Sequence, residues 1–397
     1  MKLFSHKKRP VHLGPYPLER LPRIADPSGQ PTGLTNNPQP RPVEERSVQG
    51  SQGCGHAFGL YGELFDTQVH GPVAPAAPIP NDPTELSHNL KAGQYFLDAD
   101  MVGCGIISDD AWTGESLEHR FAIVTLIAFT PQLDGSHPGD EWIDGTRQAN
   151  ADLRAAELAV ITASYIRNLG FDAKAHTPTK SDLDIGRVAL QAGLVEIHGG
   201  ELRAPYLAGG FALSVVSTEL EIQPDAPLAR RRFADELKTT KGPAWWLGVG
   251  GTRAGFGRLN GDHRPLHMGR YPMEKIDRVD EPTTLIIDDE VPRVPVRAGG
   301  FPRAAHGDMG PKFQADVKVF AFKTPQAQTY VQQIAAMVPH QDGPVAPKID
   351  QTTLDPAKNA DDLKALAYHL GGDMVGVCDV PTYAWYSHKG DGTAIEP

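Results

Sequence analysis

The chain has 397 residues, of which 22% are charged and 40% hydrophobic; these are ordinary values for a globular protein and exclude global disorder. The formal net charge of −11 gives no electrostatic reason to expect a nucleic acid or an anionic membrane as partner. Three scattered cysteines are too few for a disulfide framework or a thiolate site, so no metal site is expected in this chain.

Two further observations bear on cellular location. The first residues lack the apolar core of a secretory signal. The longest apolar run, residues 121–129, is about half the length of a membrane span. We therefore expect a cytoplasmic protein with no membrane partner.

The expected elements mix strands with segregated helices. Asp82 followed by Pro83 is typical of a helix start, so a helix is expected from residue 82 to about 97. Residues 152–169 carry apolar side chains at helical spacing and precede Gly170, a typical C-cap. The other expected elements are strands at 101–107, 120–129 and 212–222, a helix at 181–192, and Pro-rich surface loops at 25–50 and 71–83. This pattern predicts an α+β fold.

The chain repeats part of its own sequence. Residues 9–24, RPVHLGPYPLERLPRI, share eight of sixteen positions with residues 264–279, RPLHMGRYPMEKIDRV. Residues 82–112 align without a gap to residues 355–385, with thirteen of 31 positions identical. The offset grows from 255 to 273 between the two matches, so the second copy has gained 18 residues of loop. We infer an internal duplication of one domain.

The duplication predicts two domains, with residues 1–260 as the first copy and residues 261–397 as the start of a second. Residues 113–260 have no counterpart later in the chain. Strands without their partners leave backbone groups unpaired, so half a domain is not expected to close a core. The hypothesis is that the chain is a fragment and that the native protein continues past Pro397.

Two segments of the first copy resemble the cobalamin-binding core of reductive dehalogenases and of their relative, epoxyqueuosine reductase. In those families a helix ending in IRxLGY is followed by A-x-x-H, an AGLGE turn and a strand that ends in TDLPL. The equivalents here are residues 166–171, Ala173 with His176, residues 192–196 and residues 218–222. The duplication and its RPVHLGPYPLERL opening are similar to the cytosolic catabolic subgroup, in which a degenerate first copy precedes a working second one.

The resemblance implies a nitroreductase-like α+β fold that holds a corrinoid, whose cobalt abstracts halide from an aryl halide. The implied cofactors are cobalamin, bound mainly by the missing part of the second copy, and two 4Fe–4S clusters in the full-length protein, none of them in this chain. The implied partners are a halogenated aromatic substrate, with halophenols among the candidates, an electron-donating reductase or ferredoxin, and a second copy of the chain in a homodimer.

The first copy departs from the family at the positions that bind electron carriers. Cysteine runs follow the TDLPL phrase in the family, whereas residues 223–260 contain no cysteine, and iron–sulfur clusters need thiolates. The glycine of AGLGE is Val195 here, which alters a tight turn. We interpret the first copy as a degenerate domain kept for structure. The catalytic residues are expected beyond Pro397, and this chain alone is expected to be inactive.

Candidate cofactor-binding residues are therefore sought only in the second copy. Phe301 and His306 lie between glycines in residues 298–308, and Tyr383 stands where the first copy has Asp110. An aromatic ring present only in the working copy would stack on a corrin or on a substrate ring. The alternative for each is a buried loop anchor. The last two cysteines, Cys104 and Cys378, lie one position apart in register and are expected to be buried core thiols.

Two other functions stay open from the sequence. One is a non-catalytic structural or dimerisation module that pairs with a catalytic half. The other is a corrinoid- or flavin-binding relative without dehalogenase activity. A C-x2-C-x2-C-x3-C-P run in the downstream reading frame would favour the enzyme, whereas flavin absorbance of the purified chain would favour the last alternative.

Overall fold

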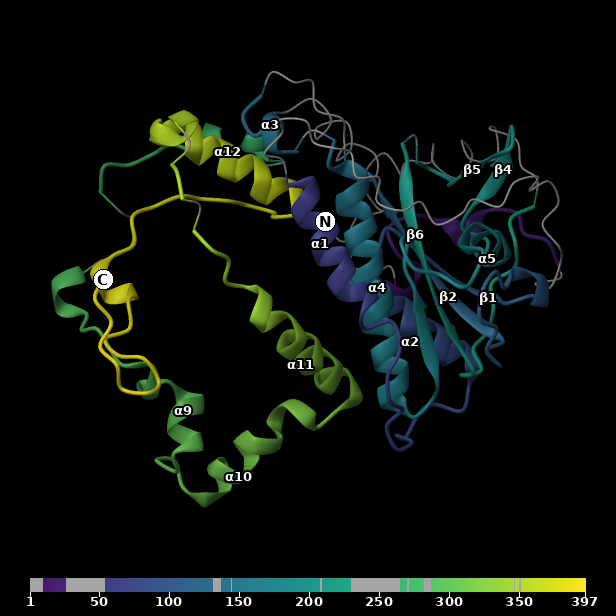
Figure 1. Cartoon of the computed structure of the whole chain (residues 1–397), viewed down its shortest axis with the longest axis horizontal. Helices are drawn as coiled ribbons and strands as arrows, with labels where there is room; N and C mark the ends of the chain where they lie inside the picture. The colour runs from purple at the N-terminus through teal and green to yellow at the C-terminus, as the bar shows by residue number, and fades with distance from the viewer. Residues whose placement is uncertain are drawn as a thin grey trace, which may run out of the picture. The chain divides into compact units, whose positions relative to one another are not determined.

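The computed structural model describes residues 10–25, 54–130, 137–143, 145–207, 209–229, 265–269, 271–281, 287–345, 347–349 and 351–397. Contacts divide the chain into two compact units, whose elements are labelled in Figure 1. Unit 1 comprises residues 1–270 and 355–372, and unit 2 comprises residues 271–354 and 373–397. The domain boundary expected at residue 260 refers to the duplication and stays a prediction. The Pro-rich loop expected at 25–50 lies outside the described residues except for its first position.

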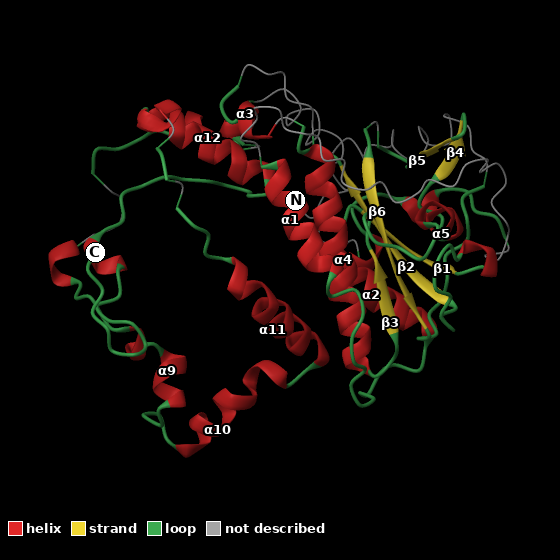
Figure 2. Cartoon of the chain, viewed as in Figure 1, coloured by secondary structure: helices red, strands yellow, loops and turns green. Residues whose placement is uncertain are grey.

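An antiparallel sheet of four strands organises unit 1 (Figure 2). Its strands, in spatial order, are β1 (Met101–Ile106), β2 (Phe121–Ala128), β6 (Phe211–Thr218) and β3 (Ala173–His176). The central strands pair over their whole length, from Phe121 opposite Thr218 to Ala128 opposite Phe211. A separate hairpin joins β4 (Glu196–His198) to β5 (Glu201–Arg203). The three expected strands are confirmed, although β6 ends four residues earlier than predicted.

Helices cover both faces of this sheet. The first face is covered by α2 (Pro83–Phe96) and α4 (Arg147–Leu169), with α1 (Gly55–Asp66) packed on α4, and the second face is covered by α5 (Ile185–Gln191) (Figure 1). The expected cap of α2 is confirmed, because the Asp82 side chain accepts a hydrogen bond from the Thr84 amide at 2.8 Å. The expected end of α4 is also confirmed at Gly170, whose φ is 101°. The mixed architecture confirms the α+β class.

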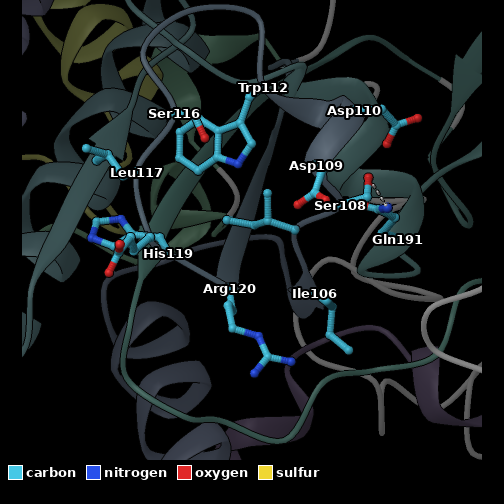
Figure 3. Close-up of a pocket in the computed structure, with 12 residues that line it drawn as sticks. Ile106, Ser108, Asp109, Asp110, Trp112, Ser116, Leu117, His119, Arg120 and Gln191 are labelled. Atoms are coloured by element: carbon cyan, nitrogen blue, oxygen red, sulfur yellow. Dashed lines mark hydrogen bonds between the residues drawn. The ribbon is translucent and has the colours of Figure 1, made fainter.

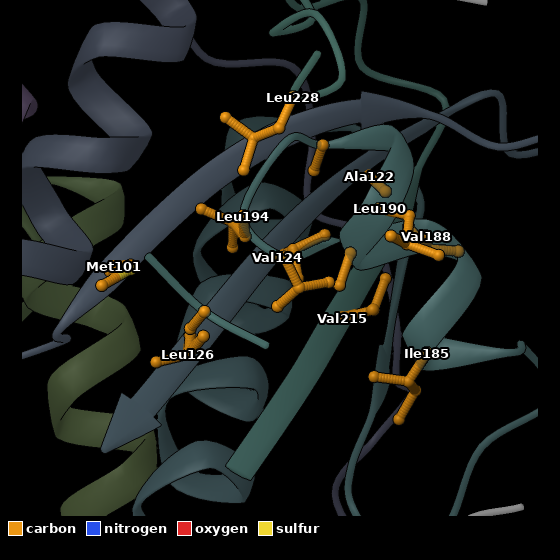
Figure 4. Close-up of a cluster of buried hydrophobic side chains, with 14 of the residues drawn as sticks. Met101, Ala122, Val124, Leu126, Ile185, Val188, Leu190, Leu194, Val215 and Leu228 are labelled. Atoms are coloured by element: carbon orange, nitrogen blue, oxygen red, sulfur yellow. The ribbon is translucent and has the colours of Figure 1, made fainter. Parts of the chain in front are cut away.

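The hydrophobic core fills the space between the sheet and α5 (Figure 4). Alternate residues of a strand point to the same face, so β2 directs Val124 and Leu126 into this core. The N-terminal segment closes the core with Tyr16, whose ring stacks on Tyr206 with centroids 5.9 Å apart. Other members are Leu18, Leu21, Met101, Ala122, Leu183, Val188, Ala189, Leu190, Ala192, Leu194 and Val215.

One packing arrangement occurs twice in unit 1. The 3-10 turn Val11–Leu13 contacts α2, and the 3-10 turn Leu266–Met268 contacts α12 (Pro356–His369). Each turn ends at a glycine with positive φ, 64° at Gly14 and 62° at Gly269. A Cβ atom would lie 2.2 Å from the Tyr95 ring at the first glycine and 2.4 Å from the Tyr368 ring at the second. Only glycine therefore fits the turn in either place.

The matched segments differ where the chain supplies no further partners. Residues 374–379 correspond to β1 by the sequence offset, yet they form no strand. Met374 and Val377 are 64% and 59% exposed, whereas Met101 and Cys104, their counterparts in β1, are fully buried. Strands bury their side chains only when neighbouring elements cover them.

Unit 2 has helical secondary structure in its described residues. Its helices are α9 (Gly300–Ala305), α10 (Pro311–Val319) and α11 (Pro325–Met337). Its C-terminal segment is held by Arg293, whose guanidinium donates to the carbonyls of Trp385 at 3.3 Å and Tyr386 at 2.7 Å. Throughout the described parts of both units, no helix combines the length and apolarity needed to cross a bilayer.

The repeated turns give a matched pair of stability predictions. Gly14→Ala and Gly269→Ala should each lower the free energy of unfolding by about 2 kcal/mol, because the new Cβ meets a tyrosine ring in a strained backbone conformation. Gly62→Ala, inside α1 with open space around it, should instead raise stability by about 0.5 to 1 kcal/mol. Urea unfolding followed by circular dichroism measures all three. Equal effects of the three substitutions would contradict the packing described here.

Candidate functional site

A cleft lies beside the end of β1 (Figure 3). Its volume is about 840 Å³, within the usual size of a small-molecule site. Its walls are residues 106–110 with Trp112, residues 116–120, and Gln191 at the end of α5. The Trp112 ring makes an edge contact with His176, with centroids 6.0 Å apart. Nothing in the sequence predicted a cleft here, because its walls come from segments that the duplication assigns to the degenerate copy.

A chain of hydrogen bonds leads from the cleft wall into the sheet. His119 lines the cleft, and its Nδ1 atom is 2.9 Å from Oγ of Ser217 on β6. On the other side of this hydroxyl, Nε2 of His176 on β3 is also 2.9 Å from Ser217 Oγ. The second ring nitrogen of His119, Nε2, is 3.2 Å from Oδ2 of Asp172. Ser217 thus connects two imidazoles, and one of them reaches a carboxylate.

The direction of each hydrogen bond follows from a backbone amide. The amide of Asp182 donates to Nδ1 of His176 at 3.3 Å, so the neutral ring of His176 carries its proton on Nε2 and donates to Ser217. The Ser217 hydroxyl then donates to Nδ1 of His119 at 2.9 Å, the shorter of its two contacts with an acceptor, since the Lys174 carbonyl oxygen is 3.5 Å away. Nε2–H of His119 donates to Asp172. With this assignment both imidazoles are neutral and each link has one donor and one acceptor.

The pKa directions agree with neutral imidazoles and an ionised carboxylate. Burial lowers the pKa of His176 to about 3, and the positive charge of Lys174 acts in the same direction. Burial also lowers the pKa of His119, against the opposing effect of its hydrogen bond to Asp172. Burial alone would raise the pKa of Asp172, but hydrogen bonds from His70 and His119 outweigh it and lower that pKa.

The sequence pointed to only one member of this chain. His176 belongs to the A-x-x-H phrase, and the structure shows that its ring is part of the sheet's buried polar interior. His119 and Ser217 were missed because they are 98 residues apart in sequence. Only the pairing of β2, β6 and β3 brings these residues together.

The residues predicted to contact a cofactor lie in unit 2. Phe301, on α9, is 62% exposed, and its ring centroid is 5.3 Å from that of Phe320. His306 follows α9 and is exposed, so the alternative of a buried loop anchor is wrong for both residues. Tyr383, in the 3-10 turn Thr382–Ala384, is half-buried. Among the described residues no hydrogen bond or ring contact joins Tyr383 to Phe301 or His306. Their cofactor role stays a prediction.

The described residues do not fit an iron–sulfur cluster. Cys104 is buried, which raises its thiol pKa to about 12, and Cys378 is exposed in unit 2. The expected burial is thus confirmed for Cys104 and wrong for Cys378. In the part of the chain that the structure describes, no three His, Cys, Asp or Glu residues gather in a way that could hold a metal ion. Phe301 and Tyr383 offer rings that do not contact one another, so we derive no chemical step through either cofactor.

Comparison with known proteins defines the class. No protein-family model matches the chain, and no curated protein matches it. Solved structures of reductive dehalogenases, however, match it at 38% to 39% identity with TM-scores of 0.83 to 0.86. The resemblance inferred from the sequence motifs is therefore confirmed, and the chain is similar to reductive dehalogenases along its whole length.

Three of these solved structures are of the catabolic reductive dehalogenase NpRdhA. An N-terminally tagged point variant of it is 39% identical with a TM-score of 0.86, and the match covers 100% of this chain and 56% of that one. Its complex with 3-bromo-4-hydroxybenzoic acid is 39% identical with a TM-score of 0.84, covering 98% and 55%. A further reductive dehalogenase structure, described as suggesting a mechanism for B12-dependent dehalogenation, is 38% identical with a TM-score of 0.84, covering 98% and 55%. The chain thus spans little more than half the length of these relatives.

Two serines on β6 test the hydrogen-bond chain. Ser217→Ala should lower the free energy of unfolding by about 2 kcal/mol, because it leaves the Nε2–H of His176 and Nδ1 of His119 without partners. Ser214→Ala is the matched control on the same strand. Its hydroxyl is equally buried and has no partner in the structure, so its removal should cost nothing. Urea unfolding distinguishes the two, and equal losses would refute the role of Ser217.

The buried histidines predict a loss of stability in weak acid. His176 has a pKa of about 3 when folded and an ordinary value of 6.5, so between these values the unfolded chain binds a proton that the folded chain does not. Stability is full above pH 6.5 and falls as the pH drops, by about 2 kcal/mol between pH 7 and pH 5 for this residue. His369, whose pKa burial lowers to about 4, adds a loss of the same sign.

Urea unfolding at pH 7, 6 and 5 measures this dependence. His176→Gln should reduce the difference between pH 7 and pH 5, whatever its effect at neutral pH. A wild-type chain whose stability is unchanged or greater at pH 5 would contradict neutral buried imidazoles.

Proposed function

We propose that this chain is part of a reductive dehalogenase that removes halide from halogenated aromatic compounds, halophenols among them. The observation that carries the proposal is the match to NpRdhA along the whole chain, at 39% identity and a TM-score of 0.86. One structure of that relative holds 3-bromo-4-hydroxybenzoic acid, a halogenated phenol. Because the chain spans 56% of the relative's length, the activity is proposed for the whole protein and not for these 397 residues alone.

The proposed cofactors are cobalamin and two 4Fe–4S clusters. When bound, they would supply cobalt chemistry at the carbon–halogen bond and the electrons that it consumes. The solved structure that is described as suggesting a mechanism for B12-dependent dehalogenation supports cobalamin. Since the three cysteines do not fit a cluster, we place the residues that hold both cofactors mainly outside this chain. Phe301, His306 and Tyr383 stay the candidates for contact with a corrin or a substrate ring.

We further propose that residues 1–260 are one copy of a nitroreductase-like domain and that residues 261–397 are the beginning of a second copy. The repeated packing of a 3-10 turn on a helix, with Gly14 under Tyr95 and Gly269 under Tyr368, supports common ancestry. The closed core of the first copy and its lack of cluster thiolates support a structural role for that copy within the enzyme. A cytoplasmic location, an electron-donating reductase or ferredoxin, and a homodimer complete the proposal.

The downstream reading frame gives a direct test. We expect the DNA after codon 397 to continue in frame and to encode a C-x2-C-x2-C-x3-C-P run about 100 residues past Pro397, because clusters of this type need four thiolates. The protein encoded by the whole frame should release bromide from 3-bromo-4-hydroxybenzoate once supplied with cobalamin, iron, sulfide and a strong reductant.

The 397-residue chain, treated in the same way, is the control and should release none. Full-frame protein that binds neither iron nor corrinoid would refute the proposed chemistry. A stop codon directly after Pro397 would favour the non-catalytic module instead.

A further inference from the structure

The cleft beside β1 presents hydrogen-bond acceptors and negative charge that the chain itself does not use. Asp109 and Glu118 both line it, are exposed, and have no ion-pair partner among the described residues. The carboxylate of Asp110 is engaged by the guanidinium of Arg187. Arg120 contributes one positive charge to the lining. Two unpaired carboxylates therefore face one guanidinium.

Gln191 supplies an independent indication of a missing ligand. Its side chain is only 2% exposed, and its Nε2 atom donates to Oγ of Ser108 at 2.9 Å. Its Oε1 atom is buried without a hydrogen-bond partner. Buried acceptors are rarely left unpaired, because the lost hydration is not replaced. Gln191 is one of the residues that line the cleft, and the terminal torsion of a glutamine is soft.

The floor and back wall of the cleft are apolar. Ile106, Ile107 and Leu117 line it, and the half-buried indole of Trp112 stands over it (Figure 3). The contact between Trp112 and His176 keeps the indole ring in place. An indole face attracts cations and also packs against apolar groups. The lining thus combines an aromatic face, a free carboxylate and an amide oxygen that lacks a donor.

We propose that this cleft binds a small primary ammonium compound with an apolar or aromatic body. The ammonium group donates to Asp109 and to Oε1 of Gln191, and the apolar body packs on Trp112 and the floor. Anionic aromatics such as halophenolates or halobenzoates are disfavoured by the two carboxylates. The proposal therefore does not depend on the dehalogenation chemistry.

An ammonium group has two chemical sources, amines and amino acids. The carboxylate of an amino acid would pair with Arg120, whereas a simple amine would leave that guanidinium in water. Arg120→Gln therefore distinguishes the two sources, since it should weaken binding only of an amino acid.

The test is calorimetric titration of the 397-residue chain with 2-phenylethylammonium and L-phenylalanine. The neutral analogue 2-phenylethanol and the anion benzoate are the comparison ligands. At least one ammonium compound should bind more tightly than both comparison ligands. Asp109→Asn should weaken that binding roughly fivefold, as expected for one ion pair near the surface. Gln191→Met, which keeps the side chain's length but removes the amide, should also weaken it.

Glu201→Gln is the matched control, because it removes one exposed carboxylate on β5, outside the cleft. It should leave the affinity unchanged. Failure of both ammonium compounds to bind, tighter binding of 2-phenylethanol or benzoate, or an equal effect of Asp109→Asn and Glu201→Gln would each overturn the proposal. Circular dichroism of the four variants verifies that the fold is intact.

Discussion

The fold of unit 1 depends on one constraint, that the backbone of a strand must find a neighbouring strand. β1 satisfies it by pairing with β2, from Met101 opposite Leu126 to Ile106 opposite Phe121. Residues 374–376 share the sequence Met-Val-Gly with β1 but pair with no strand among the described residues, and they form no strand. Because unpaired backbone groups are costly away from water, the side chains of this segment stay exposed instead of building a core. The same short sequence thus forms a strand where a neighbouring strand pairs with it and forms none where no strand does.

The packing of a 3-10 turn on its helix occurs at both matched segments. The packing of the residues that follow the turn occurs only at the first. Each 3-10 turn contacts the helix that matches it, and each glycine lies under its own tyrosine. The next residues of the repeat differ: Tyr16 is buried on Tyr206, while Tyr271 is 41% exposed. Tyr206, the ring on which Tyr16 stacks, belongs to residues 113–260, which have no counterpart later in the chain. The 3-10 turn and its glycine need only the matching helix as a partner. The tyrosine that follows the turn is buried only where the complete sheet and its loops are present.

Elements whose ends are set by neighbouring residues could be predicted from the sequence. Elements that form only through contacts between distant residues could not. Asp82 and Gly170 fix the ends of α2 and α4 through caps that need no tertiary partner. α1 was missed because its three glycines disfavour a helix, which packing of Phe58 and Phe65 stabilises. β3 was missed because its four residues become a strand only by pairing with β6. The polar chain in the candidate site joins residues of two strands, β3 and β6, to residues of the loops beside them, and no spacing rule could reveal it.

The hydrogen-bond chain through Ser217 also has an electrical polarity. Every N–H and O–H bond points from the Asp182 amide toward the carboxylate of Asp172, so the bond dipoles add and each link polarises the next. The whole series cannot be reversed, because its first donor is a peptide group that cannot exchange its role for that of an acceptor. The sheet therefore holds a fixed row of aligned dipoles, with its negative pole at a partly solvated carboxylate beside the cleft wall formed by His119.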